Sequence, residues 1–75
     1  DRAYEPTLHL RSRQLAGATL DDPQAAATQA RLLATEQVII ATDGQRYPLE
    51  VRTICLHGDH PGAVERALAV RQALI

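Results

Sequence analysis

The sequence predicts an α/β fold of one small domain, with its elements in the order helix, hairpin, strand, helix. Two amphipathic segments indicate the helices, and an Asp-Gly dipeptide after a β-branched run indicates the hairpin. A short apolar run directly before the second helical segment indicates a buried strand. Seventy-five residues provide for one domain at most, so we expect residues 1–75 to form part or all of a single α/β unit.

The first twenty residues predict a loop with at most a short extended piece, because Pro6, Gly17 and isolated apolar residues interrupt any regular period. Asp21-Asp22-Pro23 predicts a helix start, since a carboxylate can accept bonds from free N–H groups and proline fits the first helical position. We expect this helix to end near Thr35. The expected packing stripe is thin and rich in alanine, and consists of Ala26, Ala30, Leu33 and Ala34.

A β-hairpin is predicted next, from a β-branched strand at Val38–Ala41 and a return at Gln45–Tyr47. Asp43-Gly44 between them tolerates the positive φ angles of a two-residue hairpin turn. Pro48 has no N–H to donate, so the returning strand lies at an edge or ends there.

The run Thr53–His57 predicts a short strand buried on both faces, as in a parallel sheet, with Cys55 as a small buried hydrophobe rather than a nucleophile. A parallel strand needs parallel neighbours that this length scarcely provides, so we expect the chain to be a piece of a longer polypeptide. The start at Asp1 rather than at a methionine agrees with that expectation.

A final helix is predicted to open at His60-Pro61 and to run to Ile75. Its apolar side is expected to hold Ala63, Val64, Ala67, Leu68, Arg71, Leu74 and Ile75, and the residues expected outside are Glu65, Arg66 and Gln72. We expect another polypeptide or a second copy to cover the part of this side formed by Val64, Leu68 and Ile75.

The composition excludes several classes of function. A net charge of −1 provides no field that would attract nucleic acid or an anionic membrane, so we expect neither as a partner. The single Cys55 excludes an internal disulfide, and no apolar run approaches the length of a membrane helix. A cytoplasmic location is therefore the default expectation.

The best candidate for chemistry is His57-Gly58-Asp59, because functional groups in α/β proteins collect where strands end and loops lead into helices. His57 can carry a proton near neutral pH, Gly58 lets the backbone approach a ligand, and Asp59 can orient a histidine or bind a cation. The structural alternative is that Asp59 caps the last helix, His57 is a hydrogen-bonded strand-end residue and Gly58 makes the turn. His57, Asp59 and His60 are also possible metal ligands, but their spacing matches no established ligand pattern, so we assign no metal ligand and leave a divalent metal open.

A second candidate region lies near the N-terminus, where Asp1 and Arg2 are followed by Arg11 and Arg13. Guanidinium groups bind carboxylates and phosphates through paired donors, so this region is a candidate anion site. The alternative is solvated loop charge, or an ion pair between Asp1 and one of the arginines.

Several segments in this order resemble the C-terminal part of the LamB/YcsF family, the family of the 5-oxoprolinase A subunits. They are Asp1-Arg2-Ala3-Tyr4, Leu10-Arg11-Ser12-Arg13-Gln14-Leu15-Ala16-Gly17-Ala18, Asp43-Gly44, and Thr53-Ile54-Cys55-Leu56-His57-Gly58-Asp59-His60-Pro61-Gly62-Ala63. The resemblance covers nearly the whole chain, with departures at Glu5-Pro6-Thr7 and Ala16.

The resemblance implies a seven-stranded, TIM-like α/β barrel, of which this chain is the C-terminal strand-helix portion with a hairpin. It also implies an ATP-dependent lactam hydrolase that opens 5-oxo-L-proline to L-glutamate, together with two further subunits and the N-terminal remainder of the same polypeptide. His57 and Asp59 are then the catalytic candidates, and Asp1, Arg2, Arg13 and Gly58 the candidates for binding substrate or phosphate. This chain alone is expected to be inactive. The competing hypothesis is a non-catalytic α/β module that packs against a partner chain.

Overall fold

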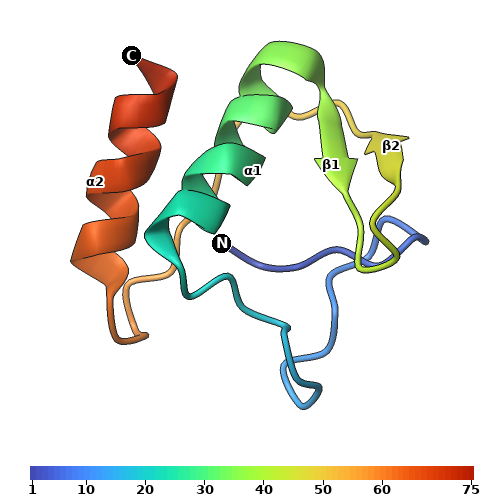
Figure 1. Cartoon of the computed structure of the whole chain (residues 1–75), viewed down its shortest axis with the longest axis horizontal. Coiled ribbons are helices and arrows are strands. Elements are labelled where there is room, and N and C mark those ends of the chain that lie inside the picture. Colours follow the sequence, from blue (N-terminus) through green and yellow to red (C-terminus); the bar gives the residue numbers. More distant parts are fainter.

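The computed structural model describes residues 1–75 and contains two helices and a two-stranded antiparallel sheet (Figure 1). The elements are α1 (Pro23–Glu36), β1 (Val38–Ile40), β2 (Arg46–Pro48) and α2 (Ala63–Leu74). The two helices pack side by side, and α1 also contacts β1. The predicted order of helix, hairpin and helix is therefore confirmed, and the N-terminal region is a loop as expected.

Helix α1 begins where the sequence predicts. The Asp22 side chain accepts a hydrogen bond from the Gln24 N–H at 3.1 Å, and Pro23 occupies the first turn. The helix ends at Gln37, which adopts a left-handed conformation with φ of 56°. Its buried residues are Ala26, Ala27, Ala30, Leu32 and Leu33. The prediction for Ala34 is wrong, because it is exposed in the last part of the helix, where no other element covers it.

The hairpin is confirmed, with Ile39 opposite Tyr47 in the antiparallel register, but its turn differs from the predicted one. The Gly44 N–H donates to the Ala41 carbonyl at 2.8 Å, so Thr42 and Asp43 are the central residues of the turn. Of the three loop residues Thr42, Asp43 and Gly44, only Gly44 has a positive φ, of 80°. This is the pattern of a three-residue hairpin loop with glycine in the left-handed position, and not of a two-residue turn.

The core is thin, as an alanine-rich chain without Phe, Trp or Met would predict. One cluster joins Ala26 and Ala30 of α1 to Val70 of α2, and a second joins Leu33 to Ile39 and Ala41. Ile54 packs against both clusters. The segment that contains Ile54 therefore holds the helical and hairpin parts together.

The prediction of a buried strand at Thr53–His57 is wrong. No strand is formed there, because the sheet of this chain consists of β1 and β2 and offers no further strand for pairing. Ile54 and Leu56 are half-buried against the α1 and α2 cluster, whereas Thr53 and Cys55 point to solvent. Cys55 is thus an exposed thiol and not the buried hydrophobe that we expected.

Helix α2 begins at Ala63, later than predicted, and follows Gly62 in a left-handed conformation with φ of 85°. The predicted packing face is wrong. Arg66, expected outside, is 2% exposed, whereas Val64 and Leu68, expected in the interface, are 69% and 55% exposed. The reason is that Val70 meets the alanine face of α1 and brings Arg66 under the N-terminal loop, where acceptors surround its guanidinium.

The exposure of Val64, Leu68 and Ile75 leaves an uncovered apolar surface on α2. Its coverage by another polypeptide stays a prediction. Neither helix is long and apolar enough to cross a membrane.

Candidate functional site

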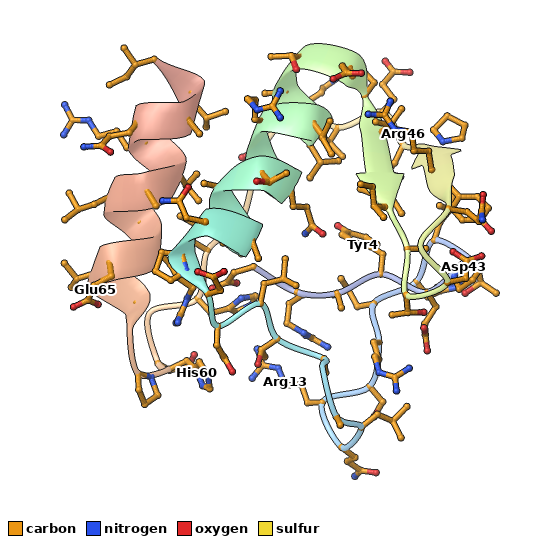
Figure 2. All side chains as sticks on the ribbon, viewed as in Figure 1. Tyr4, Arg13, Asp43, Arg46, His60 and Glu65 are labelled. Atoms are coloured by element: carbon orange, nitrogen blue, oxygen red, sulfur yellow. The ribbon has the colours of Figure 1, made fainter.

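The predicted functional residues gather around one small polar pocket, at the end of the molecule where both helices begin. The pocket has a volume of about 60 Å³, and its charged and titratable lining consists of Asp1, Arg2, Arg13, His57, Asp59, His60 and Arg66. Figure 2 shows Arg13 and His60 on this side of the molecule, below the first turns of α1 and α2. The fold therefore brings together Asp1 and Arg2, the loop that contains Arg13, and the loop from His57 to His60.

A side-chain contact in the pocket joins His57 to Asp1, which lies 56 positions earlier in the sequence. The His57 Nδ1 is 2.8 Å from Asp1 Oδ1, and the Asp1 side chain is only 5% exposed. A carboxylate accepts and does not donate, so this contact assigns the ring proton to Nδ1. The Nε2 atom of neutral His57 is then the one able to accept a proton.

The second oxygen of Asp1 contacts Arg66, whose side chain is 2% exposed. The Arg66 Nε lies 3.3 Å from Asp1 Oδ2, and the guanidinium also donates to three backbone carbonyls, those of Asp21, His60 and Pro61. No buried side-chain nitrogen or oxygen in the chain lacks a hydrogen-bond partner. The buried charge of Arg66 is thus paired, and each of its three nitrogens donates at least one hydrogen bond, as burial of a guanidinium requires.

Asp59 lines the pocket, but two of its predicted roles are wrong. The carboxylate that contacts His57 is that of Asp1, and the N-cap of α2 is Gly62, with no side-chain cap. Asp59 is exposed and makes no hydrogen bond within the chain. Its carboxylate is therefore free to meet a ligand, a cation or a group outside these residues.

Gly58 follows His57 in an exposed position. A Cβ atom built there would have no heavy atom within 4 Å, and its φ lies outside the positive range. No contact within the chain thus requires glycine at this position. Its predicted role, which is close approach of the backbone to a ligand, stays a prediction.

The three N-terminal arginines divide into two kinds. Arg2 donates to the carbonyls of Ala18 and Arg11, and Arg11 pairs with Glu5 at 3.1 Å, so both arginines shape the loop. Arg13 has no partner within the chain and lines the pocket. The ion pair of Asp1 is formed with Arg66, a residue that the sequence placed on the outside of its helix. Arg13 is the guanidinium with no partner in the chain, and Arg2, which also lines the pocket, stays a candidate for binding an anion.

At the rim of the pocket, His60 Nε2 lies 2.6 Å from Asp21 Oδ1. Hydrogen bonds from His60 and Thr19 hold the pKa of the Asp21 carboxyl below its usual value. Asp21 and Arg66 are the two site residues that sequence reasoning missed. Asp21 was assigned to the helix start, and the spacing of Arg66 on its helix placed it in solvent.

The arrangement does not provide a metal or nucleotide site by itself. No group of three or more His, Cys, Asp or Glu side chains is placed to hold a metal ion. The pocket of about 60 Å³ is far smaller than the roughly 300–1,000 Å³ of typical small-molecule sites, so these residues alone do not enclose ATP. A neighbouring cavity of about 160 Å³, mostly apolar, lies between α1 and residues 51–57, and shares Asp1, Arg2 and His57 with the polar pocket.

The chain is thus a small α/β unit in which polar side chains from separate loop segments meet where both helices begin. Comparison with known proteins gives the family. The model of the LamB/YcsF family matches residues 1–75, and the chain belongs to this family.

Two relatives are named as the A subunit of 5-oxoprolinase. The protein from Chloroflexus aggregans is 46% identical over 74 residues, which cover 99% of this chain and 29% of the relative. The protein from Acinetobacter baylyi is 44% identical over 75 residues, covering 100% of this chain and 30% of the relative. The chain thus spans less than a third of these relatives and matches their C-terminal part, as the sequence predicted.

A solved structure, the lactam utilization protein from Thermus thermophilus, is similar to this chain with a TM-score of 0.87 and 37% sequence identity. The match covers 97% of this chain and 28% of that protein. The α/β arrangement described above is therefore the one that this family adopts in the matching region. This chain contains only two strands, so the seven-stranded barrel of the complete protein stays a prediction.

Proposed function

We propose that this chain is part of the A subunit of a 5-oxoprolinase, which hydrolyses 5-oxo-L-proline to L-glutamate with ATP and two further subunits. The names of the relatives support the assignment to the A subunit. The name of the similar solved structure, a lactam utilization protein, agrees with a lactam substrate. The observation that carries the proposal is the His57–Asp1 pair, which lies in a polar pocket beside the unpaired Arg13.

Opening the ring of 5-oxoproline adds the elements of water across an amide bond. A hydroxyl group joins the carbonyl carbon, the C–N bond breaks, and the ring nitrogen receives a proton. His57 is suited to this transfer, because Asp1 holds the proton on Nδ1 and leaves Nε2 to accept one from water and deliver it to nitrogen. A positioned proton carrier of this kind contributes about 10²- to 10⁴-fold to a rate.

Arg13 is suited to bind the carboxylate of 5-oxoproline, since its guanidinium is unpaired and offers two parallel donors. Asp59 faces the same pocket as a free carboxylate. A pocket of about 60 Å³ does not enclose a nucleotide by itself, so the proposed ATP site needs further residues from the remainder of the polypeptide or its partners. Asp1, Arg2, Arg13 and Gly58 stay candidates for contact with its phosphate groups.

The test is ATP-dependent glutamate formation by the complete subunit together with its partner subunits. We expect His57→Gln to lower turnover by about 100-fold, as loss of a proton-transfer group does. His9→Gln is the matched control, because His9 is an exposed loop histidine outside the pocket. Full turnover in His57→Gln would reject the proposed role of this residue.

The second candidate function is a non-catalytic module that packs against a partner chain. The observation that favours it is the uncovered apolar surface of Val64, Leu68 and Ile75 on α2. Two variants separate the candidates. In a pure interaction module, Leu68→Glu would abolish binding of the partner chain, and His57→Gln would leave turnover of the assembled protein unchanged. Loss of turnover in His57→Gln with retained assembly supports the enzyme.

A further inference from the structure

The Arg66 side chain is buried, with 2% of it exposed, and the proposed chemistry does not use it directly. We infer that Arg66 is a positioning residue for His57, acting through the Asp1 carboxylate and through the loop that carries the histidine. This inference rests on the proposed function, because a positioned His57 matters only if His57 carries the proton. It concerns a residue of α2 whose spacing in the sequence predicts a solvent-exposed position.

The first line of contact runs through Asp1, whose two carboxylate oxygens have different partners. Oδ1 meets His57 Nδ1 at 2.8 Å, and Oδ2 meets Arg66 Nε at 3.3 Å. A carboxylate held on both oxygens cannot rotate without breaking one of the two bonds. Arg66 therefore fixes the acceptor that determines the tautomer and the orientation of the His57 ring.

The second line of contact runs through the backbone. The Arg66 guanidinium donates to the carbonyls of Pro61 at 2.8 Å and His60 at 3.3 Å, within the loop that follows His57. It also reaches the Asp21 carbonyl at 3.4 Å, just before α1. One rigid planar fork thus ties the His57 loop to Asp1 and to the start of α1, which the single ammonium of a lysine does not reproduce.

Gly62 makes room for this guanidinium. A Cβ atom at Gly62 would lie 2.9 Å from Arg66 Nη1, so an alanine there displaces the end of the arginine side chain. Gly44 has a comparable φ of 80°, against 85° at Gly62, and a Cβ there meets nothing within 4 Å. The two glycines therefore form a matched pair, since alanine strains the backbone at both and disturbs Arg66 only at Gly62.

The experiment uses the complete subunit with its partner subunits and two measurements. The first is kcat and KM for ATP-dependent glutamate formation. The second is the ring ¹⁵N spectrum of labelled histidines, in which the His57 signal is identified by its loss in His57→Gln. The variants are Arg66→Met with Arg71→Met as its control on an exposed position of the same helix, and Gly62→Ala with Gly44→Ala as its control.

We expect Arg66→Met and Gly62→Ala to lower kcat by about tenfold to a hundredfold with little change in KM, as misplacement of a catalytic group does. The His57 ring should change from the Nδ1–H form to a mixture of tautomers, and both controls should match the wild type. If Arg66→Met fails to fold, Gly62→Ala still provides the test, because it keeps the arginine and moves only its end.

An unchanged His57 tautomer in the variants overturns the inference, whether or not kcat falls, because Arg66 would then act elsewhere. Where turnover does depend on His57, an unchanged kcat with an altered tautomer overturns it as well, because the position of the ring would not limit the reaction. Full turnover in His57→Gln is a separate result. It rejects the proposed catalytic role of His57, while the ring spectrum still decides whether Arg66 positions the histidine.

Discussion

The two helices of this chain are held in different ways. Helix α1 buries five apolar residues and begins at a side-chain cap on Asp22, whereas α2 buries only Arg66 and Val70 and begins at Gly62 without a side-chain cap. The candidate functional residues lie beside the start of α2 and not along the buried face of α1. The difference teaches that the residues that stabilise this small fold and the candidate functional residues lie in separate parts of the chain. Substitutions in α1 should therefore change stability, and those near the start of α2 should change turnover.

The largest effect is expected for Leu33→Ala in α1. Leu33 is buried in the cluster with Ile39 and Ala41, so its truncation should lower the free energy of unfolding of the complete subunit by about 2–5 kcal/mol. Urea denaturation measures this change. Gln72→Ala, at an exposed polar position of α2, is the control, with an expected change of at most about 0.5 kcal/mol. Equal losses in the two variants would remove the contrast between the helices.

Asp59 provides the next test, at the start of α2. Because Asp59 caps no helix here, neither Asp59→Asn nor Asp59→Ala should change the melting temperature. If its carboxylate takes part in the reaction, each variant should lower turnover by about 100-fold, equivalent to about 2.7 kcal/mol of activation free energy. Full activity in Asp59→Asn together with a destabilised Asp59→Ala would remove Asp59 from the catalytic residues and restore the capping role.

A smaller effect is expected at the cap of α1. Asp22→Ala removes the acceptor of the Gln24 N–H and should cost about 1 kcal/mol of stability, without a change in kcat. Asp22→Asn is the control, since asparagine caps about as well as aspartate. Thermal unfolding of both variants measures the difference. A fall in kcat for Asp22→Ala would show that the start of α1 influences the candidate site at the start of α2.

The smallest effect is expected in the hairpin, away from both helix starts. The Tyr47 hydroxyl donates to Asp43 at 2.6 Å, and this bond raises the pKa of Tyr47 and lowers the pKa of Asp43. Its contribution to stability is present below the ordinary phenol pKa of about 10, and is lost as pH rises through the raised Tyr47 pKa. At the acid end, it is present above the ordinary carboxyl value and lost as pH falls through the lowered Asp43 pKa.

Asp43→Asn should return the pKa of Tyr47 toward its ordinary value. Ultraviolet absorbance of tyrosinate follows this titration, with Tyr47→Phe identifying the signal. Because both groups are exposed, the unfolding free energy at neutral pH should hardly change. A Tyr47 pKa that is the same in Asp43→Asn and the wild type would contradict the hydrogen bond.

Sequence by itself determined the features that depend on neighbouring residues. Asp22 and Pro23 define the start of α1, because a cap and its N–H groups lie within one turn. Asp43-Gly44 marks the hairpin for a similar reason, although the turn is one residue longer than predicted. The motif around His57 together with Asp1-Arg2-Ala3-Tyr4 also indicated the family, because the residues of each motif are contiguous in the chain.

Tertiary structure decided the contacts between distant segments. The pairing of His57 with Asp1 joins residues 56 positions apart, and that of Arg66 with Asp1 joins residues 65 positions apart. The spacing of apolar residues along the sequence cannot predict such a pair. The amphipathic pattern of α2 instead predicted that Val64 and Leu68 lie on the packing face of the helix. A guanidinium is buried only where enough acceptors surround it, and here the acceptors come from Asp1 and three backbone carbonyls that meet only after the chain has folded.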